Sequence, residues 1–408
     1  MSSLPVCSML DIYGTDVSAR FFSLRDQLSC PSGVRFFTAP GRSEIGGNHT
    51  DHQQGCVLAC AVSLDAIAAA APNGTSVIRI KSEGYPDVEV DLTQLSPKSD
   101  ELGTSAALIR GIAARFAESG YQISGFDAAI SSQVPGGSGL SSSAAYEVLI
   151  GTIFDGLFNN GSIAPEELAR IGQWAENHFF GKPCGLMDQT ASAMGGVTAI
   201  DFYDPSAPII KPLAVDFSKY GYALCIIDTG GSHVDLTDDY AAIPSEMKSV
   251  ANLLGTTHLR YTSREKLLAA IPQIRSEVGD RALLRALHFL ADNEKAQQEA
   301  ELLSAGNFEA FLELIRESGR SSWMYLQNLY PSGAIREQPT ALALAYCEAI
   351  LGKKGACRIH GGGFAGTIQA FVPMDECEVF AKQMEALTGP ETCRVLSVRL
   401  IGAAEVLL

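Results

Sequence analysis

The stretch Val134-Pro-Gly-Gly-Ser-Gly-Leu-Ser-Ser-Ser-Ala-Ala145 joins a predicted strand over residues 125–133 to a predicted helix over residues 144–154. Its glycines, at positions 136, 137 and 139, allow backbone conformations closed to other residues and let a ligand approach closely. The serines at positions 141–143 stand where a helix N-cap is preferred. Because free N–H groups and the positive end of a helix dipole attract anions, the stretch predicts a phosphate cradle. The alternative is an ordinary glycine-rich turn before a capped helix, and the spacing matches neither a Walker A loop nor a GxGxxG fingerprint.

The composition is that of a large globular protein. The 408 residues are 46% hydrophobic and 19% charged, which suggests two domains, or three, with sizeable cores. The net charge of −16 argues against a general nucleic-acid binder or a protein of anionic membranes. The first residues lack the features of a signal peptide, and the longest apolar run, over residues 57–71, is too short to span a bilayer. The ten cysteines lack zinc-type spacing, so we expect mostly buried thiols in a cytoplasmic protein.

A second glycine-rich segment is Pro40-Gly-Arg-Ser-Glu-Ile-Gly-Gly-Asn-His-Thr-Asp-His-Gln-Gln-Gly55, which follows a predicted strand over residues 34–39. It places Arg42, His49, Asp51 and His52 among four glycines. Such a density of hydrogen-bonding side chains between apolar segments indicates a site for a small polar ligand. The alternative is a surface loop whose charges are merely solvated.

Two later segments also contain residues that suit a functional site. The segment Glu176-Asn-His-Phe-Phe-Gly-Lys-Pro-Cys-Gly-Leu-Met-Asp-Gln189 holds Asp188 in weakly polar surroundings, where a carboxylate is either a helix cap or a general base. Residues 357–373 carry four glycines between apolar strands, which implies close backbone approach to a ligand or to another chain segment. The turn-rich Asp204-Pro-Ser-Ala-Pro208 marks the predicted domain boundary, dividing the chain into residues 1–210 and 211–408.

Four segments, in this order, resemble motifs of the GHMP small-molecule kinases, and most closely those of the galactokinase family. Residues 40–55 are similar to P-G-R-V-N-L-I-G-E-H-T-D-Y-N-x-G, and residues 135–144 to P-x-G-x-G-L-S-S-S-A. Residues 183–189 are similar to P-C-G-I-M-D-Q, and residues 361–366 to G-G-G-F-G-G. The resemblance covers roughly residues 15 to 400. It implies a two-domain α/β and α+β fold, with an N-terminal ribosomal protein S5 domain 2-like domain, a C-terminal ferredoxin-like domain and the active site between them.

The resemblance also implies an ATP-dependent sugar 1-kinase and a role for each matched residue. Asp188 would accept the proton of the sugar C1 hydroxyl, and Arg42 would keep Asp188 ionised and stabilise developing charge. The residues that bind the phosphates of ATP would be Gly136, Gly137, Ser138, Gly139, Leu140, Ser141, Ser142 and Ser143. Mg²⁺ would bind Glu176 and either Ser142 or Ser143. The sugar contacts would be Asn48, His49, Asp51, Gly185 and Tyr240.

Several residues depart from the family pattern. Glu44 stands in place of asparagine, Gly46 in place of isoleucine and Asn48 in place of a glutamate that in the family faces the sugar near C6. The asparagine removes a negative charge and adds two donors. One interpretation is a C6-altered substrate such as galacturonate, and the other, which we favour, is neutral change within a galactokinase. His360, before the triple glycine, is a further departure without an assigned role.

A sugar- and ATP-binding sensor without turnover is the alternative from another functional class. The presence of Arg42, Asp188 and the full Ser-Ser-Ser-Ala run favours an enzyme. The expected ligands are a small sugar, ATP and Mg²⁺, without nucleic acid or membrane, and the expected state is a monomer or weak homodimer.

Overall fold

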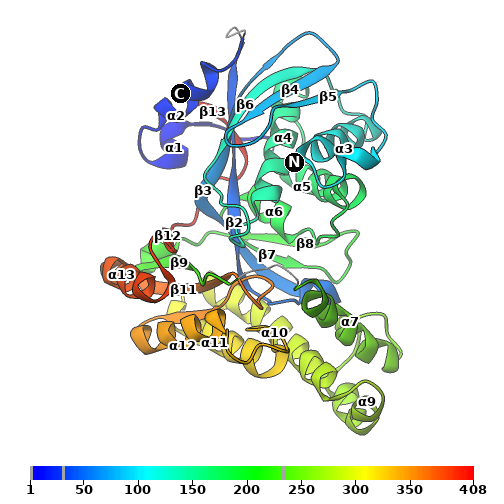
Figure 1. Cartoon of the computed structure of the whole chain (residues 1–408), viewed down its shortest axis with the longest axis vertical. Coiled ribbons are helices and arrows are strands. Elements are labelled where there is room, and N and C mark those ends of the chain that lie inside the picture. Colours follow the sequence, from blue (N-terminus) through cyan, green and yellow to red (C-terminus); the bar gives the residue numbers. More distant parts are fainter. Residues whose placement is uncertain (1–2, 30–32, 232–235) are drawn as a thin grey trace. The chain divides into compact units, whose positions relative to one another are not determined.

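The structure, a computed structural model, describes residues 3–29, 33–231 and 236–408 (Figure 1). The sequence predicts a polar loop over residues 229–240, of which residues 232–235 lie outside the described residues, as does Cys30. Two compact units emerge: Met1–Arg42, Cys60–Gly196 and Arg399–Leu408 form the first, and Ser43–Ala59 and Val197–Val398 form the second.

This division differs from the predicted boundary near residue 210. In the structure the chain passes from the first unit to the second inside β2 (Arg35–Gly46) and returns inside β3 (Cys56–Pro72). Residues 43–59 therefore belong to the second unit. The C-terminal β13 (Ala404–Leu407) returns to the first unit, where it pairs with β1 (Val6–Ser8) and β2. Strand pairing over long sequence separations therefore makes both units discontinuous in the chain.

The sheet of the first unit is built around a long, almost wholly apolar strand. Its strand order is β1-β13-β2-β3-β6-β4-β5, with β4 at Val77–Ser82, β5 at Val88–Asp91 and β6 at Phe126–Ser132. The apolar run over residues 57–71, whose many alanines would suit a buried strand or a helix, lies in β3. Its alanines are buried where they pair with β6, with Ala69 opposite Ala129. A strand covered on both faces has no amphipathic alternation, which is why its sequence was ambiguous.

Helices cover both faces of this sheet (Figure 1). On one side lie α1 (Met9–Tyr13) and α2 (Ser18–Arg25), and Phe21 and Leu24 of α2 pack against Ile67 and Ala69 of β3. The other side carries α3 (Ser105–Glu118), α4 (Ser142–Phe158), α5 (Pro165–Ala175) and α6 (Met187–Met194). A 3₁₀ turn, η2 (Ser99–Glu101), precedes α3, and a π-helical turn, η3 (Glu176–Phe180), follows α5.

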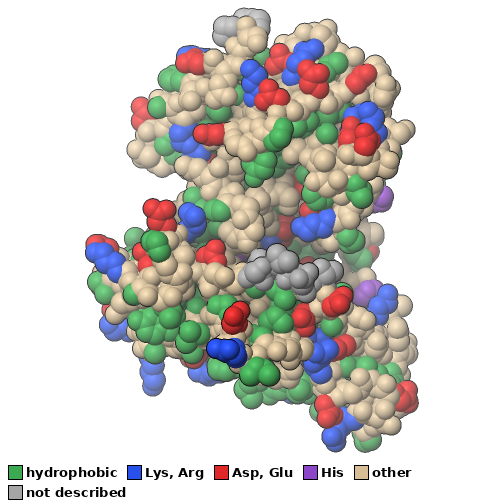
Figure 2. Space-filling view, in the orientation of Figure 1, with side chains coloured by type: hydrophobic (Ala, Val, Ile, Leu, Met, Phe, Trp, Pro, Cys, Tyr) green, Lys and Arg blue, Asp and Glu red, His purple; other side chains and the backbone are tan. Residues whose placement is uncertain are grey.

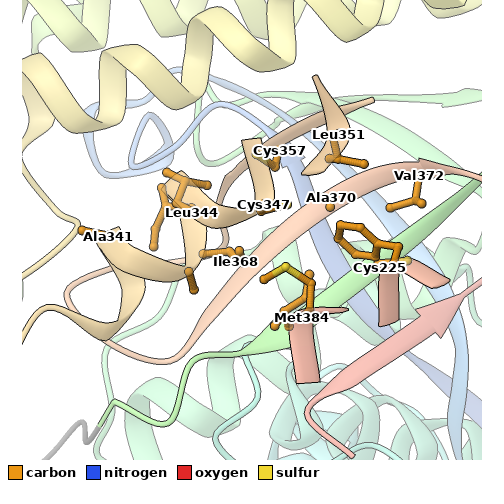
Figure 3. Close-up of a cluster of buried hydrophobic side chains, with 14 of the residues drawn as sticks. Cys225, Ala341, Leu344, Cys347, Leu351, Cys357, Ile368, Ala370, Val372 and Met384 are labelled. Carbon is orange, nitrogen blue, oxygen red and sulfur yellow. The ribbon is translucent and has the colours of Figure 1, made fainter. Parts of the chain in front are cut away.

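The second unit contains a four-stranded antiparallel sheet in the order β10-β11-β9-β12. The strands are β9 (Tyr222–Asp228), β10 (Ala356–Ile359), β11 (Thr367–Pro373) and β12 (Cys393–Leu396). Ala370 is opposite both Cys225 and Cys357, so the three side chains share one face. Leu344 of α12 (Pro339–Leu351) and Met384 of α13 (Cys377–Thr388) pack in the core on that face (Figure 3).

The second unit also contains a group of helices. Its helices are α7 (Thr237–Leu253), α8 (Arg264–Ala269), α9 (Ile271–Glu277), α10 (Asp280–Ser304) and α11 (Phe308–Ser321), which continues into the π-helical turn η6 (Ser322–Leu326). The pair β7 (Val197–Asp201) and β8 (Ile209–Leu213) is antiparallel. The 3₁₀ turns are η1 (Asp51–Gln53), η4 (Phe217–Tyr220), η5 (Leu259–Tyr261) and η7 (Met374–Glu376).

A buried carboxylate joins distant segments of the first unit. Asp65 of β3 is 0% exposed and binds two arginines, Arg20 at 2.8 Å and Arg399 at 3.0 Å. It also accepts hydrogen bonds from the hydroxyls of Tyr13 at 2.5 Å and Thr38 at 3.0 Å. The side chain therefore ties α1, α2 and β2 to the segment before β13.

Three further features concern the helices, the cysteines and the surface charge of the described residues. Among the described residues, no helix combines the length and apolar character needed to cross a membrane. The nine described cysteines are free thiols, and six of them are buried. On the face shown in Figure 2, acidic and basic side chains are interspersed rather than gathered into one basic area.

Candidate active site

Strand β2 and helix α6 bring an arginine and an aspartate together in the first unit. Arg42 binds both carboxylate oxygens of Asp188, with Nε–Oδ1 and Nη2–Oδ2 distances of 2.7 Å each. The hydroxyl of Ser141 also donates to Oδ2 of Asp188. Arg42 is 7% exposed, whereas 29% of the Asp188 side chain is accessible. The carboxylate is thus held in one orientation and can still be reached by a small molecule.

These contacts control the ionisation of Asp188. Burial alone raises the pKa of this carboxyl, but the charge and hydrogen bonds of Arg42, with the hydrogen bond from Ser141, outweigh it, so the pKa lies below its ordinary value. Asp188 is therefore an anion at neutral pH that can accept a proton only transiently. It does not cap α6, because the N-cap position belongs to Leu186 and has no side-chain cap.

The loop over residues 134–141 packs tightly on β2. The N–H of Arg42 donates to the carbonyl of Leu140 at 3.0 Å, and its guanidinium donates to the carbonyl of Gly139. A Cβ at Gly41 would lie 2.9 Å from the Leu140 carbonyl oxygen, so a glycine is needed for this approach. The side chain of Leu140 is buried, and the exposed part of the loop consists of Gly136, Gly137 and Gly139.

The start of α4 is left without a side-chain cap. Ser141 occupies the N-cap in a left-handed conformation with φ of 55°, but its hydroxyl is directed to Asp188 and makes no cap hydrogen bond. A Cβ at Gly136 or Gly137 would meet nothing within 4 Å, so this side of the loop is open. Ser138, by contrast, closes the turn by donating to Pro135 at 2.8 Å. An uncapped helix start beside an open glycine loop has the geometry of an anion site.

Glu176 stands beside this helix start. It is 2% exposed, and its Oε1 lies 3.4 Å from the hydroxyl of Ser143 and 3.4 Å from the ammonium of Lys182. Ser142 is the first residue of α4. Carboxylate and hydroxyl oxygens are ligands that Mg²⁺ accepts beside phosphates and water, so Glu176 and Ser143 fit this ion. No group of three or more His, Cys, Asp or Glu suited to a metal occurs in the described part of the chain.

The sequence analysis assigned no role to three residues that lie near Glu176, which are Glu147, Lys182 and Gln189. Gln189 donates to Glu176 at 3.1 Å and to Glu147 at 2.8 Å. Burial and the nearby Glu176 raise the pKa of Glu147 well above its ordinary value. Lys182 and Gln189 lie inside the segment over residues 176–189, so this segment could have pointed to them as functional residues. Glu147 lies in α4, and no sequence motif around it marks it as functional.

Asn48 occupies a closed hydrogen-bond network in the second unit. Its side-chain N–H₂ donates to Glu44 at 3.1 Å and to the carbonyl of Gly361 at 2.7 Å. Its side-chain oxygen accepts from Asn328 at 2.9 Å and Ser322 at 3.3 Å. Asn48 is 0% exposed, and both ends of its amide are paired within the protein. The predicted contact of Asn48 with the sugar would require these hydrogen bonds to rearrange, and it stays a prediction.

His49 and Tyr240 lie against the same glycine loop. His49 Nε2 is 2.9 Å from the carbonyl of Gly362, and the hydroxyl of Tyr240 donates to the carbonyl of Gly363 at 2.7 Å. Tyr240 lies in the first turn of α7, not in the loop where it was expected. The segment over residues 361–363 therefore approaches polar side chains of its own unit.

The two remaining residues that were predicted to contact the sugar, Asp51 and Gly185, lie in different units. Asp51 begins η1 in the second unit, and 17% of its side chain is accessible. It accepts a hydrogen bond from the N–H of His52 at 2.9 Å. Gly185 is in the first unit, in the segment before α6. The predicted sugar residues thus come from both units.

The structure explains the other departures from the family pattern. Glu44 forms a buried ion pair with Arg358, which is 0% exposed. His360 is buried and fills a polar network, with Nδ1 2.9 Å from Thr367 Oγ1 and Nε2 3.1 Å from Ser43 Oγ. A Cβ at Gly46 would lie 1.7 Å from a carboxyl oxygen of Glu299, so that carboxyl occupies the space of a larger side chain.

We expect Gly46→Ile, which introduces the residue of the family pattern, to destabilise the protein by about 1–3 kcal/mol through overpacking against Glu299. Urea denaturation measures the free energy of unfolding. The double variant Gly46→Ile/Glu299→Ala removes the clash and should be more stable than Gly46→Ile alone. A Gly46→Ile protein as stable as the original would show that Glu299 does not limit the space at Gly46.

Comparisons with known proteins show which protein family this chain resembles. The family described as GHMP kinases N terminal domain matches residues 102–196, and the galactokinase galactose-binding signature matches residues 27–72. The crystal structure of Lactococcus lactis galactokinase complexed with galactose superposes with a TM-score of 0.81 at 23% identity, covering 96% of this chain and all of that one (100%). Methanococcus jannaschii mevalonate kinase gives 0.63 at 13% identity, covering 91% of this chain and 100% of its own. These structures confirm the predicted two-domain α/β fold of GHMP kinases.

Sequence relatives narrow the family. The galactokinase of Actinobacillus pleuropneumoniae is 30% identical over 364 residues, which are 88% of this chain and 91% of that protein. The galactokinase of Glaesserella parasuis serovar 5 (strain SH0165) is 32% identical over 346 residues, which are 84% of this chain and 86% of that protein. With identity of this level over most of both chains, and with both family matches, the chain belongs to the galactokinase family of the GHMP kinases.

Proposed function

We propose that the protein is a galactokinase, which transfers the γ-phosphoryl group of ATP to the C1 hydroxyl of galactose. The observation that carries this proposal is the bidentate Arg42–Asp188 pair, to which Ser141 is joined by a hydrogen bond, beside an uncapped start of α4. The curated relatives that carry the name galactokinase support galactose as the sugar.

The residues divide the work of phosphoryl transfer between them. Asp188 accepts the proton of the C1 hydroxyl as that oxygen forms its bond to the γ-phosphorus and ADP leaves. Arg42 holds the carboxylate in position and counters negative charge that develops nearby. The first N–H groups of α4 and the loop over residues 136–143 bind the phosphates of ATP. Because Arg42 keeps the pKa of Asp188 low, positioning contributes more to the rate than base strength does.

Glu176 and Ser143 are the residues that would hold Mg²⁺. Their oxygens face each other at 3.4 Å, and Lys182 and Gln189 fix the orientation of the Glu176 carboxylate. When bound, Mg²⁺ supplies positive charge to the phosphate oxygens.

We expect Glu176→Gln to raise the Mg²⁺ concentration needed for half-maximal activity by about tenfold or more, because it removes the charged ligand. ADP release measured against Mg²⁺ concentration tests this. Glu166→Gln, in the first turn of α5, is the matched control and should leave the Mg²⁺ dependence unchanged. Equal dependence in all three proteins would remove Glu176 from the metal site.

An ADP-release assay with Mg-ATP and single sugars tests the function itself. We expect turnover with galactose and background rates with galacturonate, because Asn48 is already paired within the protein and offers no group suited to a C6 carboxylate. Faster turnover of galacturonate would support the C6-altered substrate instead. Binding of galactose and ATP without ADP release would support the sensor. The cytoplasmic location and the monomer or weak homodimer stay predictions.

A further inference from the structure

A buried glutamine of the first unit lies between two carboxyl groups. The side-chain N–H₂ of Gln189, in α6, donates to Glu176 at 3.1 Å and to Glu147 of α4 at 2.8 Å. All three side chains are buried. We infer that Glu147 and Gln189 are positioning residues, which form an amide bridge with Glu176 and hold its carboxylate beside Ser143, the other residue proposed for Mg²⁺. This inference rests on the proposed function, which needs Mg²⁺ at Glu176 and Ser143.

The amide bridge ties Glu176 twice to one face of α4. Glu147 follows Ser143 by four positions, so the two side chains lie one turn apart on the same side of the helix. Ser143 contacts Oε1 of Glu176 directly at 3.4 Å, whereas Gln189 donates to the other oxygen, Oε2. Because the amide binds Oε2, the carboxylate of Glu176 is held with Oε1 toward Ser143.

The backbone of α5 packs closely against the amide bridge. A Cβ at Gly172 would lie 3.3 Å from Oε2 of Glu147 and 3.4 Å from Cγ of Gln189. A glycine inside a helix lowers the stability of that helix, but here it lets the helix backbone approach both side chains. With α5 this close, Glu147 and Gln189 have little room to leave the positions in which they meet.

Two buried oxygens of the amide bridge, Oε1 of Glu147 and Oε1 of Gln189, have no hydrogen-bond partner among the described residues. An unpaired buried polar atom destabilises the folded state, so stability alone would favour an apolar side chain at position 147. Burial and the nearby Glu176 raise the pKa of Glu147, which favours its neutral form. A neutral carboxyl still offers Oε2 as an acceptor to Gln189. The polar side chain at position 147 therefore suits a positioning role better than a purely structural one.

The first test measures binding without turnover. The probe is AMPPNP, an ATP analogue that is not hydrolysed, and calorimetry gives its dissociation constant in EDTA and in Mg²⁺. The ratio of the first constant to the second reports what the metal contributes to binding. Glu147→Leu removes an acceptor of the amide bridge and Gln189→Leu removes its donor, so each should lower this ratio by about tenfold, as expected when a group that orients a metal ligand is lost. Binding of AMPPNP in EDTA should stay within about twofold of the original.

Two variants are the controls for this test. Glu147→Gln keeps an acceptor oxygen at position 147 and should hold the ratio within about twofold of the original. Thr152→Val should leave the ratio unchanged, although Thr152 is also buried in α4 and its hydroxyl donates to the carbonyl of Val148 at 2.7 Å. If urea denaturation shows that Glu147→Leu does not fold, Gln189→Leu decides the result. An original ratio in the leucine variants, an equal loss in Glu147→Gln, or no effect of Mg²⁺ on the unchanged protein would each overturn the amide bridge.

The second test separates the amide bridge from the proposed function. ADP release by Glu147→Leu is measured against Mg²⁺ and against galactose. The Mg²⁺ concentration for half-maximal activity should rise by about tenfold, while KM for galactose should stay within about twofold of the original. Galactose phosphorylation with an unchanged Mg²⁺ dependence would keep the proposed function and refute the amide bridge. Calorimetric losses in a protein that releases no ADP with galactose would keep the amide bridge and refute the galactokinase.

Discussion

Asp188→Asn is expected to lower kcat for galactose phosphorylation by about 10²–10⁴-fold, the usual contribution of a positioned acid–base group. Asparagine keeps the size of the side chain but cannot take the proton of the C1 hydroxyl. It also leaves Arg42, which is 7% exposed, without its bidentate anion. ADP release with saturating galactose and Mg-ATP measures the loss.

Asp201→Asn is the matched control for this prediction. Asp201 also pairs with an arginine, Arg260, at 2.8 Å, and 28% of its side chain is accessible, against 29% for Asp188. Its kcat should stay within about twofold of the original, because Asp201 takes no part in the proposed chemistry. ATP binding to Asp188→Asn, followed by calorimetry, should be retained. Full turnover by Asp188→Asn would exclude this carboxylate from the mechanism.

Asp65→Ala is expected to cost about 3–5 kcal/mol of the free energy of unfolding, because removing one partner leaves buried opposite charges uncompensated. Arg399 has only 3% of its side chain accessible and would keep its charge without this carboxylate. Tyr13 and Thr38 would lose the same acceptor. Urea denaturation measures the change.

Asp26→Ala is the control for stability. Asp26 pairs with Arg25 at 2.8 Å, but 67% of its side chain is accessible, and exposed pairs contribute at most about 1 kcal/mol. The two variants therefore remove the same kind of ion pair in different surroundings. If Asp65→Ala lost no more stability than Asp26→Ala, the cluster around Asp65 would not hold the termini of the first unit together.

The sequence by itself determined the elements whose information is local. The glycine and serine run at 136–143 predicted the turn between β6 and α4, since glycines permit positive φ angles and α4 is apolar on most of its surface. The motif segments predicted the association of Arg42 with Asp188, and the structure places these two residues in direct contact.

Tertiary structure alone decided the features that depend on distant partners. Alanine-rich β3 is a strand because β6 pairs with it. Ser141 does not cap α4, because its hydroxyl donates a hydrogen bond to Asp188, which lies 47 residues further along the chain. Asn48 faces Gly361, which is 313 residues away in the chain. A side chain with several possible partners adopts the one that folding brings within hydrogen-bonding distance, and local sequence carries no record of that choice.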